Sequence, residues 1–203
     1  MAEALLAVLA ELEQAGAALD GLGVRWALIG GLAVSAQTEP RFTRDVDLCI
    51  AAKDDAEAER VVLRLRESGY EVVTVLEHAP SGRLSTVRLR RGAVSAGAVM
   101  LDVLFASSGI EAEIVAAASS LEGVLGDRTR IARIGHLIAL KVLARDDRRR
   151  PQDAADLRAL IGAASPAELD LARQSVRLIT ERGFHRQRAL DSLLAQAIAE
   201  AAD

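Results

Sequence analysis

The sequence is poor in aromatic residues and contains a single cysteine. Aromatic side chains make up 2% of its 203 residues, so it offers few flat surfaces on which single-stranded nucleic acids could stack. Cys49 has no second cysteine with which to form a disulfide within the chain, and a cysteine-rich zinc site is excluded as well. Hydrophobic residues nevertheless account for 51% of the chain, so its core must be built from Ala, Leu, Val and Ile.

Long apolar runs are also missing. Spanning a bilayer takes about 20 consecutive apolar residues, and no stretch of the chain reaches that length. Residues 1–21 are largely apolar, but they carry Glu3, Glu11 and Glu13 and lack the basic start of a signal peptide. Because the leucines recur at helical spacing, this segment is expected to be an amphipathic helix. We therefore expect a cytoplasmic protein with no membrane partner.

Two familiar catalytic motifs are absent, and the net charge is only −4. The lack of a G-x-x-x-x-G-K-[ST] loop argues against a P-loop NTPase, and the lack of G-x-S-x-G argues against a serine hydrolase. The charge as a whole gives no electrostatic attraction to nucleic acid. Between residues 128 and 150, however, eight Arg or Lys stand against two Asp. This segment is either a basic binding patch or a solvated helix end and loop.

Apolar periodicity predicts an α+β fold. Short apolar or alternating runs predict strands over residues 24–29, 46–51, 70–76, 84–90 and 98–105. Helical spacing, capping residues and Gly or Pro punctuation predict helices over residues 3–19, 31–37, 55–68, 134–145 and 153–161, from 166, and over 186–202. We expect residues 1–108 to form a core with a small mixed sheet and flanking helices. Residues 109–203 are expected to form a helical bundle.

Two aspartates in an apolar strand, Asp45 and Asp47, are the first indication of a site. Residues two apart in a strand point to the same face, about 6–7 Å apart at their Cα atoms. Their like charges repel unless a positive charge lies between them, and carboxylate ligands suit Mg²⁺ or Mn²⁺. A D-x-D pair taken alone is more often a helix cap or a salt bridge.

A third aspartate, Asp102, lies in the apolar run AVMLDVLFA. An unpaired carboxylate in such a run costs several kcal/mol, and the nearby sequence offers no partner for it. If its strand lay beside that of Asp45 and Asp47, three carboxylates would meet at one metal centre. The pair Gly30 and Gly31 after the first strand could be a plain turn. It is the combination of a strand, two glycines, D-x-D and a later buried Asp that indicates a site.

The chain resembles the DNA polymerase β-like nucleotidyltransferase superfamily in two stretches. LIGGLAVSAQTEPRFTRDVDLCI resembles the hG[GS]…DhDh motif, and MLDVLF resembles the segment with the third carboxylate. Two further stretches resemble the AbiEii/MenT-like nucleotidyltransferase toxins. They are the R-x-T-x-DVDL run that begins at Arg41 and LIALKVLARDDRRRPQDAADLRAL, which contains Lys141, residues 148–150, Asp153 and Asp156.

The resemblance implies transfer of a nucleoside monophosphate from an NTP, with Mg²⁺ or Mn²⁺ as cofactor. It implies that three carboxylates hold the metal and, with a lysine, perform the reaction: Asp45, Asp47, Asp102 and Lys141. It implies that five residues bind the nucleotide: Gly30, Gly31, Arg41, Thr43 and Asp153. Asp156 is a further candidate, whereas Arg44 is expected to point to the opposite face of its strand.

Each of these roles has a simpler alternative. Arg41 could be a surface arginine, Lys141 could extend its ammonium to solvent, and Asp153 could be a helix cap. The function also has alternatives. The first hypothesis is a toxin that modifies tRNA or another RNA and is restrained by a cognate antitoxin. The others are an antibiotic-type enzyme acting on a small molecule, and a non-catalytic antitoxin or binding protein with a nucleotidyltransferase-like fold.

Overall fold

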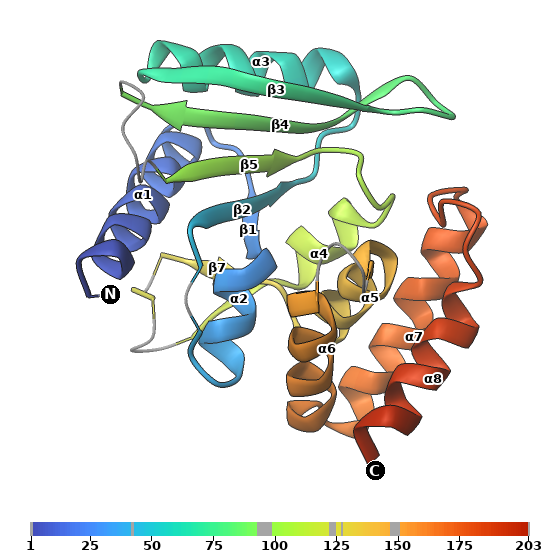
Figure 1. Ribbon diagram of the computed structural model, residues 1–203. Helices are drawn as coiled ribbons and strands as arrows, with labels where there is room; N and C mark the ends of the chain where they lie inside the picture. Colours follow the sequence, from blue (N-terminus) through green and yellow to red (C-terminus); the bar gives the residue numbers. More distant parts are fainter. Residues whose placement is uncertain are drawn as a thin grey trace.

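The structure is a computed structural model that describes residues 2–41, 43–92, 99–121, 125–126, 128–146 and 151–202. Over these residues a seven-stranded mixed sheet combines with helices, which confirms the α+β expectation (Figure 1). The strands are β1 (Trp26–Ile29), β2 (Asp45–Ile50), β3 (Tyr70–His78), β4 (Arg83–Arg91), β5 (Met100–Leu104), β6 (Ser119–Ser120) and β7 (Arg130–Ile131). The helices are α1 (Ala2–Gly21), α2 (Gly30–Gln37), α3 (Asp55–Glu67), α4 (Glu111–Ala117), α5 (Ile134–Ala144), α6 (Pro151–Ala163), α7 (Pro166–Glu181) and α8 (Leu190–Ala202).

The sheet has the strand order β3-β4-β5-β2-β1-β7-β6, so the D-x-D strand β2 lies at its centre. Trp26 is in register with Ile50, and a Cβ added at Gly16 of α1 would lie 2.7 Å from the Trp26 ring. Residues that are opposite each other on neighbouring strands share a face of the sheet. Helix α1, which contacts Trp26, therefore covers the face of β2 that carries Ile50. Alternation along β2 places Asp45 and Asp47 on the opposite face, as the sequence predicted.

Capping residues define where two of the helices begin. The Asp54 side chain accepts a hydrogen bond from the amide of Glu57 at the start of α3. Ser165 caps α7 in the same way by accepting from the amide of Glu168. The Glu168 carboxylate does not complete a capping box, because it accepts instead from the amide of Gly135, 2.6 Å away at the start of α5.

The helices α5 to α8 pack together and meet the sheet through α2. Helix α5 is buried along most of its length because α6, α7 and α8 all contact it. Helix α2 contacts both α5 and α6, so the segment between β1 and β2 connects the sheet with the helices (Figure 1). None of the helices in the described parts of the chain is long and apolar enough to cross a membrane.

The structure departs from the sequence-based expectations at two places. The sheet takes β6 and β7 from beyond residue 108, and strands of two residues are too short to show an alternating pattern. The last helix begins at Leu190 rather than residue 186, because Arg186 and Gln187 have left-handed φ values of 52° and 57°. The division at residue 108 stays a prediction, and residues 148–150 lie outside the described residues.

Candidate functional site

A cleft of about 930 Å³ opens between the sheet and the helices α5 and α6. Its walls come from the β1–α2 turn, the start of β2, the middle of β4 and β5, and the segment before α8. All nine site residues predicted from the sequence line this cleft: Gly30, Gly31, Arg41, Thr43, Asp45, Asp47, Asp102, Lys141 and Asp153. Segments that are far apart in the sequence therefore meet in one place.

Strand register brings the aspartates together on one face of the sheet. Asp47 on β2 is directly opposite Asp102 on the parallel strand β5, and Ile29, which precedes the glycine pair, is opposite Asp47. Neighbouring strands lie about 4.7–4.9 Å apart, so Asp47 and Asp102 are close neighbours on one face. Asp45 lies two residues before Asp47 on the same face. We call Asp45, Asp47 and Asp102 the acidic face.

Asp102 has a partner that the sequence analysis missed. Arg88 lies opposite it in the β4–β5 pair and binds it with two hydrogen bonds, from Nε to Oδ1 at 2.8 Å and from Nη2 to Oδ2 at 2.6 Å. The nearby sequence offers Asp102 no partner, and the partner comes instead from a neighbouring strand of the sheet. The hydrogen bonds that Arg88 donates to Asp102 raise the pKa of Arg88, burial opposes this, and the negative charges of Asp102, Asp45 and Asp47 add to the increase.

Each glycine of the Gly30 and Gly31 pair makes room for a side chain of the chain itself. Gly30 has φ +66°, and a Cβ there would overlap the carboxylate of Asp47. A Cβ at Gly31 would lie 2.6 Å from Nη2 of Arg41 and 3.1 Å from Oγ1 of Thr43. Their predicted role toward the triphosphate stays a prediction, but the glycines already bring these side chains close to the backbone of the turn.

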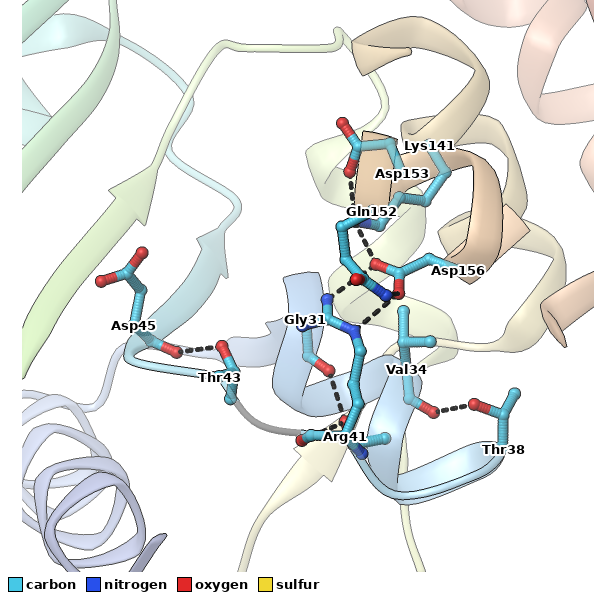
Figure 2. A network of polar contacts seen from close by, with 11 residues as sticks. Gly31, Val34, Thr38, Arg41, Thr43, Asp45, Lys141, Gln152, Asp153 and Asp156 are labelled. Carbon is cyan, nitrogen blue, oxygen red and sulfur yellow. Dashed lines mark hydrogen bonds and ion pairs between the residues drawn. The ribbon is translucent and has the colours of Figure 1, made fainter. Parts of the chain in front are cut away.

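A second group of charges lies on the helical side of the cleft (Figure 2). Lys141 Nζ is 2.7 Å from Asp153 Oδ1 and 2.7 Å from Asp156 Oδ2. Arg41 binds the same Asp156 through Nε at 2.6 Å and Nη2 at 2.7 Å. We call these four residues the helical ion-pair cluster. It connects the α2–β2 segment with α5 and α6.

The helical ion-pair cluster is largely shielded from solvent. Side-chain exposure is 1% for Asp156, 4% for Asp153 and 12% for Lys141. Lys141 therefore does not extend to solvent, and Arg41 is not a free surface arginine. Burial raises the pKa of Asp156, but hydrogen bonds from Arg41 and Lys141 outweigh burial and leave this pKa below its usual range. Asp156 remains ionised and holds both cations.

Two arginines that the sequence analysis did not assign to the site also line the cleft. Arg44 was expected to point to the opposite face of its strand, but it precedes β2 and lines the cleft. Arg186 reaches the cleft from the segment before α8, where its Nη2 lies 3.4 Å from the carbonyl oxygen of Ser107. No local pattern marks Arg186, because its position depends on left-handed backbone within the α7–α8 connection.

The side chains of Asp45 and Asp47 are suitable ligands for a divalent cation, both in their chemistry and in their position. Their carboxylates share one face of the cleft, and oxygen ligands suit Mg²⁺ or Mn²⁺. The role of Asp102 as a third ligand stays a prediction; in this arrangement each of its oxygens accepts a hydrogen bond from Arg88. Accordingly, no group of three or more acidic, His or Cys residues arranged for a metal occurs in the part of the chain that the structure describes.

Between residues 128 and 146, the part of the predicted basic segment in which the structure describes basic side chains, several of these side chains are bonded within the chain. Arg130 donates to the carbonyl oxygen of Ala118, and Arg133 pairs with Glu168. Arg145 pairs with Glu200. These three arginines, together with Lys141, support the chain's own helices rather than forming an open basic patch.

Solved structures place this fold among the nucleotidyltransferases. The chain is similar to an antigenic nucleotidyltransferase-like protein from Paracoccidioides brasiliensis, with 21% identity, a TM-score of 0.54 and coverage of 93% of this chain and 92% of that one. It is also similar to ANT(2")-Ia in complex with adenylyl-2"-tobramycin, with 18% identity, a TM-score of 0.51 and coverage of 95% and 97%. At these identities the likeness shows the fold alone.

The family follows from the sequence as a whole. A family model described as "Nucleotidyl transferase AbiEii toxin, Type IV TA system" matches residues 14–203. The chain belongs to this AbiEii family and is a nucleotidyltransferase, which confirms the resemblance inferred from the glycine pair and the aspartates. Among curated proteins, no sequence matches the chain significantly.

Proposed function

We propose that this protein is a metal-dependent toxin that transfers a nucleoside monophosphate from an NTP to a hydroxyl of an RNA acceptor, with tRNA as the first candidate. The observation that carries the proposal is the acidic face, which lies in the cleft beside the turn of Gly30 and Gly31. Family membership supports nucleotidyl transfer and a cognate antitoxin as partner.

The polar and charged groups of the cleft match the charges of the groups that this reaction brings together. The start of α2 offers backbone amides beside Gly30, where the triphosphate would bind. Asp45 and Asp47 would hold the divalent ion, which when bound supplies positive charge to offset the phosphates. Asp102 would accept the proton of the acceptor hydroxyl. Lys141 and Asp153 would fix the helical wall of the cleft, because they are bonded to each other.

An RNA acceptor is supported by arginines of the cleft. Arg44 and Arg186 line the cleft on different segments, and arginine suits the phosphates of a nucleic acid. The segment between residues 128 and 150 gives less support, because Arg130, Arg133 and Arg145 serve the chain's own structure.

A small-molecule acceptor is a second candidate, and one observation favours it. Part of the cleft is lined by leucines of β3, β5 and α5, namely Leu76, Leu104, Leu137, Leu140 and Leu143. Such an apolar wall can cover the ring of a compact substrate. The similar structure of ANT(2")-Ia holds an adenylylated tobramycin, so aminoglycosides are the class to test.

A labelled-NTP transfer assay tests the proposal. The protein is incubated with Mg²⁺ and each of the four labelled NTPs, with total tRNA in one arm and a set of aminoglycosides in the other. We expect label on RNA, no label when EDTA replaces Mg²⁺, and none with Asp45→Asn. The variant Asp191→Asn changes an exposed aspartate on α8 and should behave like wild type. Label on the small molecules alone would favour the second candidate, and label on neither from folded protein would reject both.

A further inference from the structure

Arg88 places a permanent positive charge within the acidic face. Its side chain is 43% exposed and that of Asp102 is 12% exposed, so the pair lies at the wall of the cleft and not in the core. Arginine stays protonated in proteins, and its planar guanidinium matches both oxygens of a carboxylate. The acidic face therefore contains a cation of its own before any ligand binds.

The guanidinium and a divalent ion compete for the same atoms. Each Asp102 oxygen lies 2.6–2.8 Å from a nitrogen of Arg88. A metal that used Asp102 would share an oxygen that already accepts a hydrogen bond from Arg88, and its double positive charge would lie close to the charge of the guanidinium. Asp45 and Asp47 also interact electrostatically with Arg88, so the guanidinium lowers the attraction of the whole acidic face for cations.

We propose that Arg88 is a positioning residue that keeps Asp102 out of the cation site until the nucleoside triphosphate binds. The proposal rests on the proposed function, since it takes the cleft to be the nucleotide site. Binding is then ordered, with tight binding of the divalent ion following that of the triphosphate. A divalent ion alone binds weakly to Asp45 and Asp47. The triphosphate offers Arg88 a second bidentate partner. When Arg88 turns to the phosphates, Asp102 is released toward the cation site and the acceptor hydroxyl beside it.

Arg90 provides a matched comparison on the same strand. It lies two residues after Arg88, so it shares the same face of β4, and it is opposite Met100 rather than an aspartate. Its partner is Glu71 on β3, at 2.9 Å, and it is not among the residues that line the cleft. Both arginines are ion-paired on one strand, but only Arg88 contacts the acidic face.

Binding of Mn²⁺ to the protein without nucleotide or acceptor tests the proposal. Free Mn²⁺ is measured by electron paramagnetic resonance for wild type, Arg88→Gln and Arg90→Gln. We expect Arg88→Gln to bind Mn²⁺ about tenfold more tightly, because a positive charge beside three carboxylates is removed. Arg90→Gln should match wild type. With a non-hydrolysable NTP analogue present, the difference between wild type and Arg88→Gln should shrink, because Arg88 has then already left Asp102.

An unchanged or weaker Mn²⁺ affinity in Arg88→Gln would overturn the proposal, and so would an equal gain in Arg90→Gln. If Arg88→Gln does not fold, Arg88→Lys replaces it. Lysine keeps the charge but lacks the bidentate contact, so a smaller gain of about threefold is expected and no gain would overturn the proposal. Failure of the proposed function is distinguishable, because it appears as absent label transfer while the Mn²⁺ measurement needs neither NTP nor acceptor.

Discussion

The acidic face and the helical ion-pair cluster border the same cleft, but their charges are arranged in opposite ways. The cluster contains two acidic and two basic residues, and the pair of Arg41 with Asp156 has side-chain exposures of 25% and 1%. The acidic face brings three carboxylates together, and the Arg88 side chain that binds one of them is 43% exposed. In the helical ion-pair cluster, buried charges of opposite sign join elements of the fold. In the acidic face, neighbouring negative charges at the wall of the cleft are suited to binding a cationic ligand.

The two arrangements also differ in what they contribute to stability. A buried carboxylate that holds two cations is costly to remove, because the cations are left without a partner in a poorly solvated place. Excess negative charge in the acidic face works against folding when no cation is bound. Substitutions in the helical ion-pair cluster should therefore affect stability first, and substitutions in the acidic face should affect activity first.

The largest effect is expected from Asp156→Ala. It leaves Arg41 and Lys141 without their shared partner, so the free energy of unfolding should fall by about 3–5 kcal/mol. Urea unfolding followed by circular dichroism measures this loss. The control is Asp170→Ala, which breaks an exposed pair with Arg173 and should cost less than about 0.5 kcal/mol. Equal losses in the two variants would show that the cluster does not hold the helices.

Asp47→Asn is expected to lower activity strongly and to leave stability unchanged or raised, in contrast to Asp156→Ala. It removes one of the two carboxylates that would hold the divalent ion, so nucleotidyl transfer should fall by about 10²–10³-fold. The melting temperature of the ligand-free protein should stay the same or rise, because repulsion from Asp45 is relieved. Parallel transfer assays and thermal melts measure both properties. A melting temperature that dropped as far as that of Asp156→Ala would contradict the comparison between the two regions.

The glycine turn allows a finer test of the acidic face. Gly30 and Gly82 have nearly the same left-handed φ, +66° and +65°, but only Gly30 has the Asp47 carboxylate where a Cβ would be. Replacing either by Ala should cost about 1–2 kcal/mol of stability through the backbone. Gly30→Ala should also lower transfer activity, since it displaces Asp47, while Gly82→Ala should leave activity unchanged. Activity that fell equally in both variants would show that Asp47 does not depend on Gly30.

The smallest effect expected is in the response to acid. Because the pKa of Asp156 is lowered below 3.8, the folded protein binds fewer protons there than the unfolded chain. The resulting stability is fully present above pH 3.8 and is lost as the pH falls through the lower, folded pKa. Asp156→Asn has no such group, so its stability should fall less steeply between about pH 5 and about pH 3. Urea midpoints at the two pH values measure the slopes, and equal slopes would contradict the assignment.

Features with a local cause could be predicted from the sequence. The alternation of β2 indicated that Asp45 and Asp47 share a face, and the Ser165 cap indicated where α7 begins. The glycine pair together with the aspartates indicated the nucleotidyltransferase family, which the family model confirms. Strand alternation and capping extend over a few residues, because they act between near neighbours, whereas the family motif combines several such short segments.

Features that depend on contacts between distant segments could not be predicted in this way. The partner of Asp102 was missed because Arg88 reaches it through the pairing of β4 with β5. Arg186 was missed because the segment before α8 brings it to the cleft only after the helices have packed. The strands β6 and β7 were missed because two residues carry no periodicity.

The sequence by itself determined the α+β fold class, the acidic strand and the family. Only the tertiary structure decided which charge faces which. The sequence of β4 contains Arg88 and Arg90 in equivalent alternating positions, and nothing local distinguishes them. The register of β4 against β5 places one opposite Asp102 and the other opposite Met100. Backbone pairing across the sheet fixes this choice: it brings Arg88 into contact with the acidic face and leaves Arg90 outside the cleft.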